Sequence, residues 1–300
     1  MRKNPLFEVN DKQYTLGHKT WFMGIINATP DSFSDPGLSM DKERVVQRGL
    51  DLEKQGADIL DIGGESTRPG SDPVSIEEEL RRIIPAITEL RKRTKILISV
   101  DTTKAKVAEE ALAAGADIIN DISAFRFDDG MPLLASDKGA SVVLMHMKGV
   151  PKTMQVNPYY EDLYQEIGCF LKERITTATA YGIKREKIIV DPGIGFGKSM
   201  QHNLAILNNL DFLKDLDRPI LLGISRKSFI GKILNLPPHE RIEGTIASAV
   251  LAVLRGAHIL RVHDIEQVKR AITVAEAIIH EGLFAQNDTG SGKEKRIRYA

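Results

Sequence analysis

The sequence of 300 residues has little that would place it in a specialised class of protein. Its single cysteine, Cys169, excludes a disulfide within the chain and indicates a reducing compartment. Neither charge is in excess, because 41 Lys and Arg residues balance 41 Asp and Glu residues, so we expect no nucleic-acid partner. No apolar run reaches the roughly eighteen residues of a membrane helix, and no apolar leader is present. We therefore expect a cytoplasmic protein that binds no membrane.

Short apolar runs and helical segments alternate along most of the chain. The runs are rich in Ile and Val and almost continuously apolar, which is typical of parallel strands buried on both faces. The expected strands are 21–26, 57–62, 95–100, 116–119, 141–145, 187–190, 219–224 and 257–262. The expected helices lie near 41–55, 75–93, 103–114, 130–138, 159–181, 200–215, 239–255 and 264–282.

An internal repeat supports this alternation. Residues 56–61 (GADILD), 115–120 (GADIIN) and 256–261 (GAHILR) share one pattern, in which a glycine ends a helix and a strand follows at once. Eight such units close most simply into a (β/α)8 TIM barrel, and an open doubly wound sheet is the alternative. The expected division is an N-terminal hairpin extension at 1–20, one barrel domain at 21–282 and a flexible tail at 283–300.

Polar side chains lie at the carboxyl end of every expected strand. In a barrel, the carboxyl ends of the strands share one mouth, where the chemistry of this fold gathers. Any one of these residues has an ordinary explanation, since Asp101 can cap a helix and His146 can be a hydrogen-bonded core residue. Eight polar ends in one mouth are hard to explain by capping alone, so we predict a binding site. The ends are Asn27, Asp61, Asp101, Asn120, His146, Asp191, Ser225 with Arg226 and Lys227, and Arg261 with His263.

These side chains divide into two chemical groups. Carboxylates, an amide and an ammonium suit a flat heterocycle, because a carboxylate can accept two N–H bonds from a guanidine-like edge. Cationic and neutral side chains of the first, second and eighth strands suit an anion such as phosphate, since the first and eighth strands are neighbours in a closed barrel. The heterocycle group is Asp101, Asn120, Asp191 and Lys227, and the anion group is Asn27, Arg68, Arg261 and His263.

Three glycine-rich segments lie among these ends. The segment DPGIGFGKS at 191–199 is similar to a phosphate-binding P-loop, but Pro192 stands where that motif needs a glycine, so we expect Lys198 to face solvent. The segments at 27–37 and 63–73 are either mobile lids or ordinary surface loops. No His or Cys spacing typical of a metal site occurs, although Mg²⁺ carried in with a pyrophosphate needs few protein ligands.

The motifs together are similar to those of one enzyme family. They are GIINATPDSFSDPG, DIGGESTRPG, SVDTTK, IINDISA, VLMHMKGVPKTMQ, DPGIGFGKS, GISRKSFIG and RVHD, in this order between about residues 21 and 282. The series resembles that of dihydropteroate synthase, whose fold is the (β/α)8 barrel. One departure is Pro36, which stands where a second glycine is expected and would stiffen its loop.

The resemblance implies a reaction and its binding residues. The family joins 6-hydroxymethyl-7,8-dihydropterin pyrophosphate to p-aminobenzoate and gives 7,8-dihydropteroate and pyrophosphate in folate synthesis. The implied pterin pocket is Asp101, Asn120, Asp191 and Lys227, with Met145 and Ile122 packed on the ring. The implied pyrophosphate contacts are Asn27, Thr67, Arg68, Arg261 and His263, with Asn27 also touching Mg²⁺. The implied p-aminobenzoate site is Ser66, Thr67, Pro69, Phe196, Lys227 and Ser228.

A transferase of this kind needs little acid–base chemistry. The arylamine is already a neutral nucleophile, so we expect a dissociative path in which the C–O bond breaks before the amine attacks. Mg²⁺, Arg261 and His263 would stabilise the leaving pyrophosphate, while Asp101 and Asp191 would stabilise the pterin cation. The residues expected to act in catalysis are Asp101, Asp191, Lys227, Arg261 and His263.

Three other functions and one assembly question stay open at this point. A Schiff-base aldolase would use Lys227. A corrinoid-linked methyltetrahydrofolate methyltransferase would also bind a pterin, but it needs no pyrophosphate site. A non-catalytic pterin-binding paralogue would tend to lose the anion group. The family is usually dimeric, so a homodimer is expected; the apolar helix at 245–254 is a candidate interface, with ordinary barrel packing as the alternative.

Overall fold

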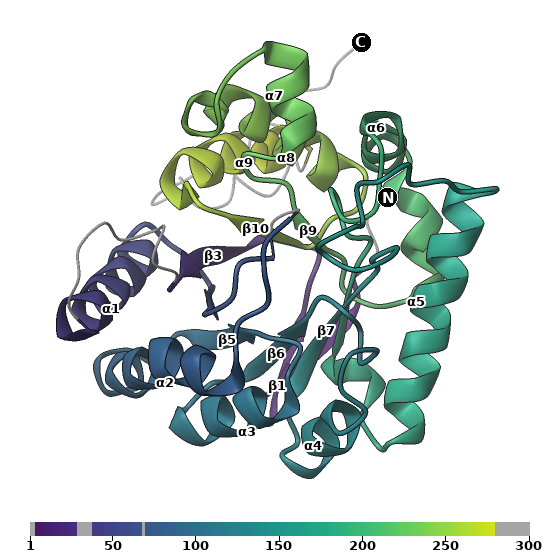
Figure 1. The fold of residues 1–300 in the computed structure, drawn as a ribbon. Helices are drawn as coiled ribbons and strands as arrows, with labels where there is room; N and C mark the ends of the chain where they lie inside the picture. The colour runs from purple at the N-terminus through teal and green to yellow at the C-terminus, as the bar shows by residue number, and fades with distance from the viewer. Residues whose placement is uncertain (1–3, 29–37, 68–69, 280–300) are drawn as a thin grey trace, which may run out of the picture.

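In the computed structural model, which describes residues 4–28, 38–67 and 70–279, eight parallel strands form a barrel inside a ring of helices (Figure 1). The strand order is β8-β7-β6-β5-β4-β3-β10-β9, and a bridge between Val190 and Ile220 nearly closes the barrel between β8 and β9. The predicted (β/α)8 fold is confirmed. The barrel strands are β3 (Trp21–Asn27), β4 (Ile59–Gly63), β5 (Leu97–Asp101), β6 (Ile118–Asp121), β7 (Ser141–Met145), β8 (Ile188–Asp191), β9 (Leu221–Gly223) and β10 (Ile259–Val262).

The helices follow the expected pattern with one addition. Helix α7 lies directly after β9 and was not predicted, and the second half of the helix expected at 200–215 is the 3-10 helix η3 (Leu210–Leu216). No helix among the described residues is long and apolar enough to cross a membrane. The helices are α1 (Leu38–Lys54), α2 (Ile76–Arg93), α3 (Ala105–Ala114), α4 (Met131–Asp137), α5 (Leu163–Ala180), α6 (Met200–Asn208), α7 (Ser228–Leu234), α8 (Ile242–Leu254) and α9 (Ile265–Ile279).

The repeat predicted at three strand starts has a structural role. Asp58, Asp117 and His258, the third residues of its three copies, each accept a backbone N–H from the neighbouring strand, at 2.9, 2.8 and 3.0 Å. Because these side chains take the place of a strand partner, regular pairing begins after them, and β4, β6 and β10 start two residues later than expected. Most of the polar residues predicted at the strand ends lie within the last residues of the strands themselves, such as Asn27, Asp101 and Asp191, which end β3, β5 and β8.

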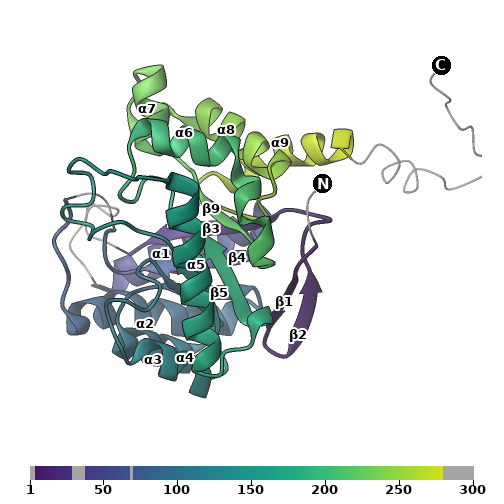
Figure 2. The same ribbon diagram turned by 90° about the vertical axis from the view of Figure 1, so that its right-hand side faces the viewer.

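The N-terminal hairpin closes one end of the barrel. Strands β1 (Leu6–Val9) and β2 (Lys12–Thr15) form the predicted hairpin. Its buried side chains Phe7, Val9 and Leu16 pack against the first inward-facing residues of the barrel strands, such as Met23 and Ile259. Figure 2 shows the hairpin at this end and the long loops at the other. The hairpin seals the bottom of the barrel with apolar contacts, so the polar residues gather at the opposite mouth.

Candidate active site

The centre of the mouth is an arginine held between two aspartates. Alternate residues of a strand face the same side of the sheet, so Asp61, Asp101 and Arg261 all face the barrel interior. The Arg261 guanidinium donates from Nε to Asp61 Oδ2 at 2.5 Å and from Nη2 to Asp101 Oδ2 at 2.6 Å. Burial opposes its charge, but the attraction of the two carboxylates outweighs burial and raises the pKa of Arg261. Asn120 donates from Nδ2 to Asp61 Oδ2 at 3.1 Å and completes this network.

Asp101 and Asp191, the two carboxylates predicted to bind the pterin, are buried, and burial disfavours their ionised forms. Burial raises the pKa of Asp101 to about 7, although the nearby Arg261 pulls it down. Burial likewise raises the pKa of Asp191 to about 6, against the N–H of Gly193, which donates to Asp191 Oδ1 at 2.7 Å. Among the described residues, Asp101 Oδ1 has no hydrogen-bond partner. A ligand that brings N–H donors to these oxygens would stabilise their ionised forms.

A lysine and an aromatic ring form the opposite wall. Lys227 precedes α7, and its Nζ lies 4.4 Å from the centre of the Phe196 ring. Burial lowers the pKa of Lys227 to about 8, while Asp191 raises it. Ile122, Met145 and Phe196 belong to one small apolar cluster at the mouth. Asp191 and Asp101 lie near enough to Lys227 to raise its pKa, and Met145 pairs with Asp191, so these polar side chains lie beside an apolar cluster on which a flat ring could pack.

The side of the mouth predicted to bind an anion carries a neutral histidine. His263 Nδ1 lies 3.0 Å from Ser225 Oγ. Burial, Arg226 and Arg261 lower the pKa of His263 to about 3, so this side chain is uncharged at neutral pH and can bind an anion only as a hydrogen-bond donor. Arg261 supplies the positive charge. It thus connects the heterocycle and anion groups, which the sequence suggested as separate clusters.

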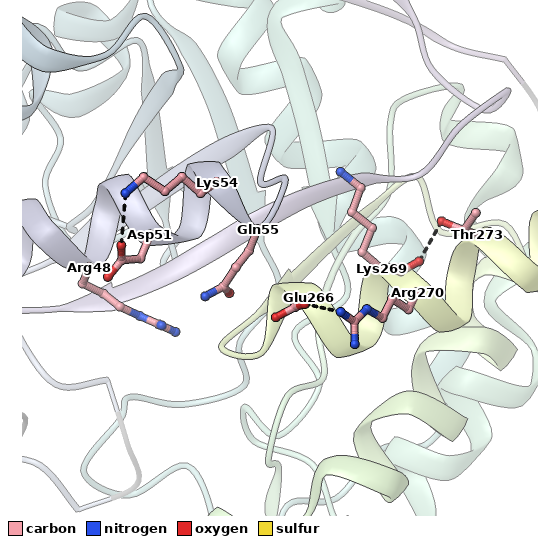
Figure 3. A pocket seen from close by; sticks show the side chains of 8 residues that line it. All are labelled: Arg48, Asp51, Lys54, Gln55, Glu266, Lys269, Arg270 and Thr273. Atoms are coloured by element: carbon pink, nitrogen blue, oxygen red, sulfur yellow. Dashed lines mark hydrogen bonds and ion pairs between the residues drawn. The ribbon is translucent and has the colours of Figure 1, made fainter.

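A cavity of about 600 Å³ lies outside the barrel between α1 and α9 and is lined by charged side chains (Figure 3). Its charges have partners: Asp51 pairs with Lys54 at 3.9 Å, and Lys269 donates to Gly56 O at 3.0 Å. Arg48 donates from Nη2 to the backbone oxygen of His263 at 2.6 Å. We interpret this region as support for His263 from behind, and not as a second substrate site.

The remaining predicted residues that the structure describes lie at the rim. Asn27 ends β3 and is half-buried opposite Gly63, while Ser66 and Thr67 are half-buried in the loop after β4. Ser228 is exposed at the start of α7. Arg68, Pro69, the segment 29–37 with Pro36, and the tail at 283–300 lie outside the described residues. The part of the chain that the structure describes contains no group of three or more His, Cys, Asp or Glu side chains suited to a metal ion.

Comparison with known proteins identifies the family. Residues 23–263 match the model of the pterin binding enzymes. The chain is 46% identical over 275 residues to the dihydropteroate synthase of Synechocystis, which covers 91% of this chain and 95% of that protein. The chain belongs to the dihydropteroate synthase family.

Solved structures of this family share the fold. The Xanthomonas albilineans dihydropteroate synthase with 4-aminobenzoic acid has a TM-score of 0.86 and 44% identity, covering 92% of this chain and 99% of that chain. A Xanthomonas albilineans dihydropteroate synthase in complex with 7,8-dihydropteroate has a TM-score of 0.82 and 42% identity, with the same coverage of 92% and 99%. Family membership therefore rests on sequence and on fold over nearly the whole domain.

Two features of this dihydropteroate synthase family member were missed or misjudged from the sequence. Asp61 was noted as a strand end but not assigned to the site, although it is fully buried against Arg261. Lys198 was expected to face solvent, and this was wrong, because its side chain is 2% exposed. Its Nζ lies 2.9 Å from His146 Nδ1 and 3.0 Å from Phe196 O, so it ties the 191–199 loop to the end of β7.

Proposed function

We propose that this protein condenses 6-hydroxymethyl-7,8-dihydropterin pyrophosphate with p-aminobenzoate to give 7,8-dihydropteroate and pyrophosphate. The observation that carries the proposal is the buried mouth in which Asp101 and Asp191 face Lys227 and Arg261. The carboxylates of this pocket can accept hydrogen bonds from the N–H groups of a flat ring, and Arg261 adds a fixed positive charge at the edge of the pocket. A pterin ring whose side chain ends in a pyrophosphate requires both features at once.

The pocket suits a dissociative reaction. The C–O bond to the pterin methylene breaks first, and its electron pair leaves with the pyrophosphate. The amine nitrogen of p-aminobenzoate then forms the new C–N bond and loses a proton. Positive charge on the pterin favours ionised Asp101 and Asp191, whose pKa values of about 7 and about 6 leave both groups poised near neutral pH. Arg261 faces the charge that develops on the leaving group.

Mg²⁺ belongs to the proposal as a companion of the pyrophosphate. Among the described residues, Asn27 offers one amide oxygen at the rim, which fits a hard cation that keeps most of its ligands as water and phosphate oxygens. When bound, the ion would neutralise charge on the leaving group. The protein itself orients the substrate beside it through Arg261 and His263.

A pyrophosphate-release assay tests this function. With both substrates and Mg²⁺, we expect dihydropteroate and pyrophosphate in equal amounts, and we expect a chelator or Asn27→Ala to lower the rate at least about tenfold, the scale of one charge-assisted contact. Without p-aminobenzoate, labelled oxygen should still exchange between bridging and non-bridging positions of the substrate. Tight pterin binding without product would instead indicate a non-catalytic paralogue. Exchange that needs p-aminobenzoate would argue against the dissociative order.

We further propose that the protein forms a homodimer through α8. Ala247, Leu251 and Leu254 are exposed on this helix at the spacing of one helical face, and the two leucines are 54% and 55% exposed. Burying such a stripe against a second copy would remove it from water.

Leu251→Glu is expected to convert the dimer to a monomer, because it places a charge in the apolar contact. Leu133→Glu is the matched control, since Leu133 is also 54% exposed but lies on α4, away from α8 (Figure 1). Sedimentation velocity measures the result. A dimer that survives Leu251→Glu but not Leu133→Glu would place the interface elsewhere.

A further inference from the structure

The loop that carries Ser66 and Thr67 is closed at its stem by one carboxylate. Glu65 accepts a hydrogen bond at Oε2 from the backbone N–H of Val74, at 3.2 Å. Because Val74 lies nine residues further along the chain, this bond joins the two ends of the loop. The same oxygen accepts a charge-assisted bond from the Nζ of Lys104. The position of the loop therefore depends on a lysine from a different part of the barrel.

Lys104 is held in place by a second, fully buried acid. Its Nζ also lies 2.5 Å from Glu79 Oε2 on α2, and the Glu79 side chain is 0% exposed. Burial opposes the lysine charge, but hydrogen bonds from Lys104 to Glu65 and Glu79 outweigh burial and raise its pKa. A buried carboxylate that loses its cation is strongly destabilised, so Glu79 keeps the ammonium charged and stationary.

The backbone at the stem is packed as tightly as its charges. A side chain at Gly64 would place its Cβ 2.9 Å from Ile83 Cγ2 and 3.0 Å from Glu79 Cγ, so any larger residue there would force one of these side chains to shift. Arg82 of α2 donates from Nη1 to Gly64 O at 2.7 Å. The chain therefore leaves β4 in one direction, with Glu65 directed at Lys104.

The far side of the loop has weaker contacts. The N–H of Gly70 donates to Pro151 O at 3.3 Å, and Lys152 pairs with Asp72 at 3.0 Å. The side chains of that pair are 67% and 82% exposed, and such surface pairs contribute little. Among the described residues, the loop is thus fixed at its stem by the charges of Glu65, Lys104 and the buried Glu79, while Gly70 and Asp72 make weaker contacts with the neighbouring loop.

We propose that Lys104 is a positioning residue for the reaction, which acts through Glu65 to hold Ser66 and Thr67 against p-aminobenzoate and the pyrophosphate. Lys104 follows Asp101 by three residues, in the turn that leads from β5 to α3. One short segment therefore carries both Asp101, a carboxylate predicted to bind the pterin, and Lys104, the lysine that holds the loop through Glu65. This inference deepens the proposed function and rests on it.

The test compares Lys104→Met with Lys106→Met. Lys106 is exposed and pairs only with Glu109 and Glu110 on its own helix among the described residues, so it controls for the loss of one lysine. For Lys104→Met we expect KM for p-aminobenzoate to rise about tenfold or more, the scale of one lost hydrogen bond to a charged group. The affinity for a pterin without pyrophosphate, measured by calorimetry, should stay unchanged, because Asp101 and Asp191 are intact. Lys104→Arg should restore most of the loss.

Hydrogen exchange measures the effect of Lys104 on the loop independently of the enzyme activity. Backbone amides at 70–75 should exchange faster in Lys104→Met than in wild type or Lys106→Met, whether or not the protein is assayed with substrates. If Lys104→Met does not fold, Glu65→Gln replaces it, because glutamine keeps the bond from Val74 and removes only the charge pair. Unchanged KM for p-aminobenzoate, or a parallel loss of pterin affinity, would overturn the proposal. A wild-type protein that makes no dihydropteroate would refute the proposed function instead. The exchange rates would then test only whether Lys104 holds the loop in place.

Discussion

Arg261→Ala is expected to lower kcat/KM for dihydropteroate formation by about 10²-fold or more, the usual scale for the loss of one preorganised charge contact. The guanidinium is the only group observed to bridge Asp61 and Asp101 among the described residues. Its removal takes away the charge proposed to face the leaving pyrophosphate. It also leaves two buried carboxylates without their cation.

The second consequence gives the variant a distinctive pH dependence. Arg261 lowers the pKa of Asp101 against the effect of burial, so Arg261→Ala should raise that pKa further above about 7. Activity that depends on ionised Asp101 should then be lost at a higher pH than in wild type. A pH–rate profile measures the shift of this acidic limb. Arg261→Lys would keep a positive charge, but lysine lacks the forked guanidinium that spans two carboxylates. This variant should therefore restore the activity only in part.

Arg255→Ala is the matched control for the loss of an arginine. Arg255 is exposed at the end of α8, where its Nη2 donates to Asn208 Oδ1 at 3.2 Å. This change should leave both kcat/KM and the pH profile as they are. An Arg261→Ala enzyme with the activity of wild type would remove Arg261 from the site.

The barrel could be predicted because its signals are local. Each strand is a short apolar run, and each repeat copy carries its own glycine and strand start, so the count of eight needs no knowledge of distant contacts. The alternation of side chains then places strand-end residues such as Asp101 and Asp191 in one mouth. The residue types at those ends were enough to separate acceptors for a heterocycle from groups for an anion.

The features that could not be predicted depend on contacts between distant parts of the chain. Asp61 and Arg261 are separated by 200 positions and meet only because β10 pairs with β3 and β3 with β4. Lys198 is buried because His146, 52 positions away, offers it a nitrogen and a carbonyl oxygen. Hydrophobic periodicity says which face of an element is buried, but it cannot say which polar groups are buried with it.

The glycines of the 191–199 loop also depend on contacts with a distant part of the chain. Gly193 has a φ of 72°, and a Cβ there would lie 1.9 Å from His146 O. The position thus requires glycine because of a close approach to β7, and not because a phosphate approaches its backbone. This is the physical reason why the similarity to a P-loop was misleading.

Asp191→Asn is expected to lower kcat/KM by about 10²-fold or more, because the neutral amide cannot stabilise a developing pterin cation. At the same time it should stabilise the fold. An unfolded Asp ionises near pH 4, whereas burial raises the pKa of Asp191 to about 6. The folded state therefore holds the proton more tightly, and the protein loses stability as the pH rises from about 4 to about 6. Above that range the full cost is present, about 3 kcal/mol for a shift of about two units.

Thermal unfolding at pH 8 should therefore show a higher Tm for Asp191→Asn than for wild type, and the difference should shrink as the pH falls toward about 4. The amide oxygen can still accept the N–H of Gly193, so the loop keeps its local bond. Asp211→Asn, at an exposed position in η3, should change neither the activity nor Tm. An inactive variant with a lower Tm at pH 8 would show that Asp191 also holds the fold together. The predicted pairing of lost activity with gained stability is the behaviour of a carboxylate that is buried for binding and not for folding.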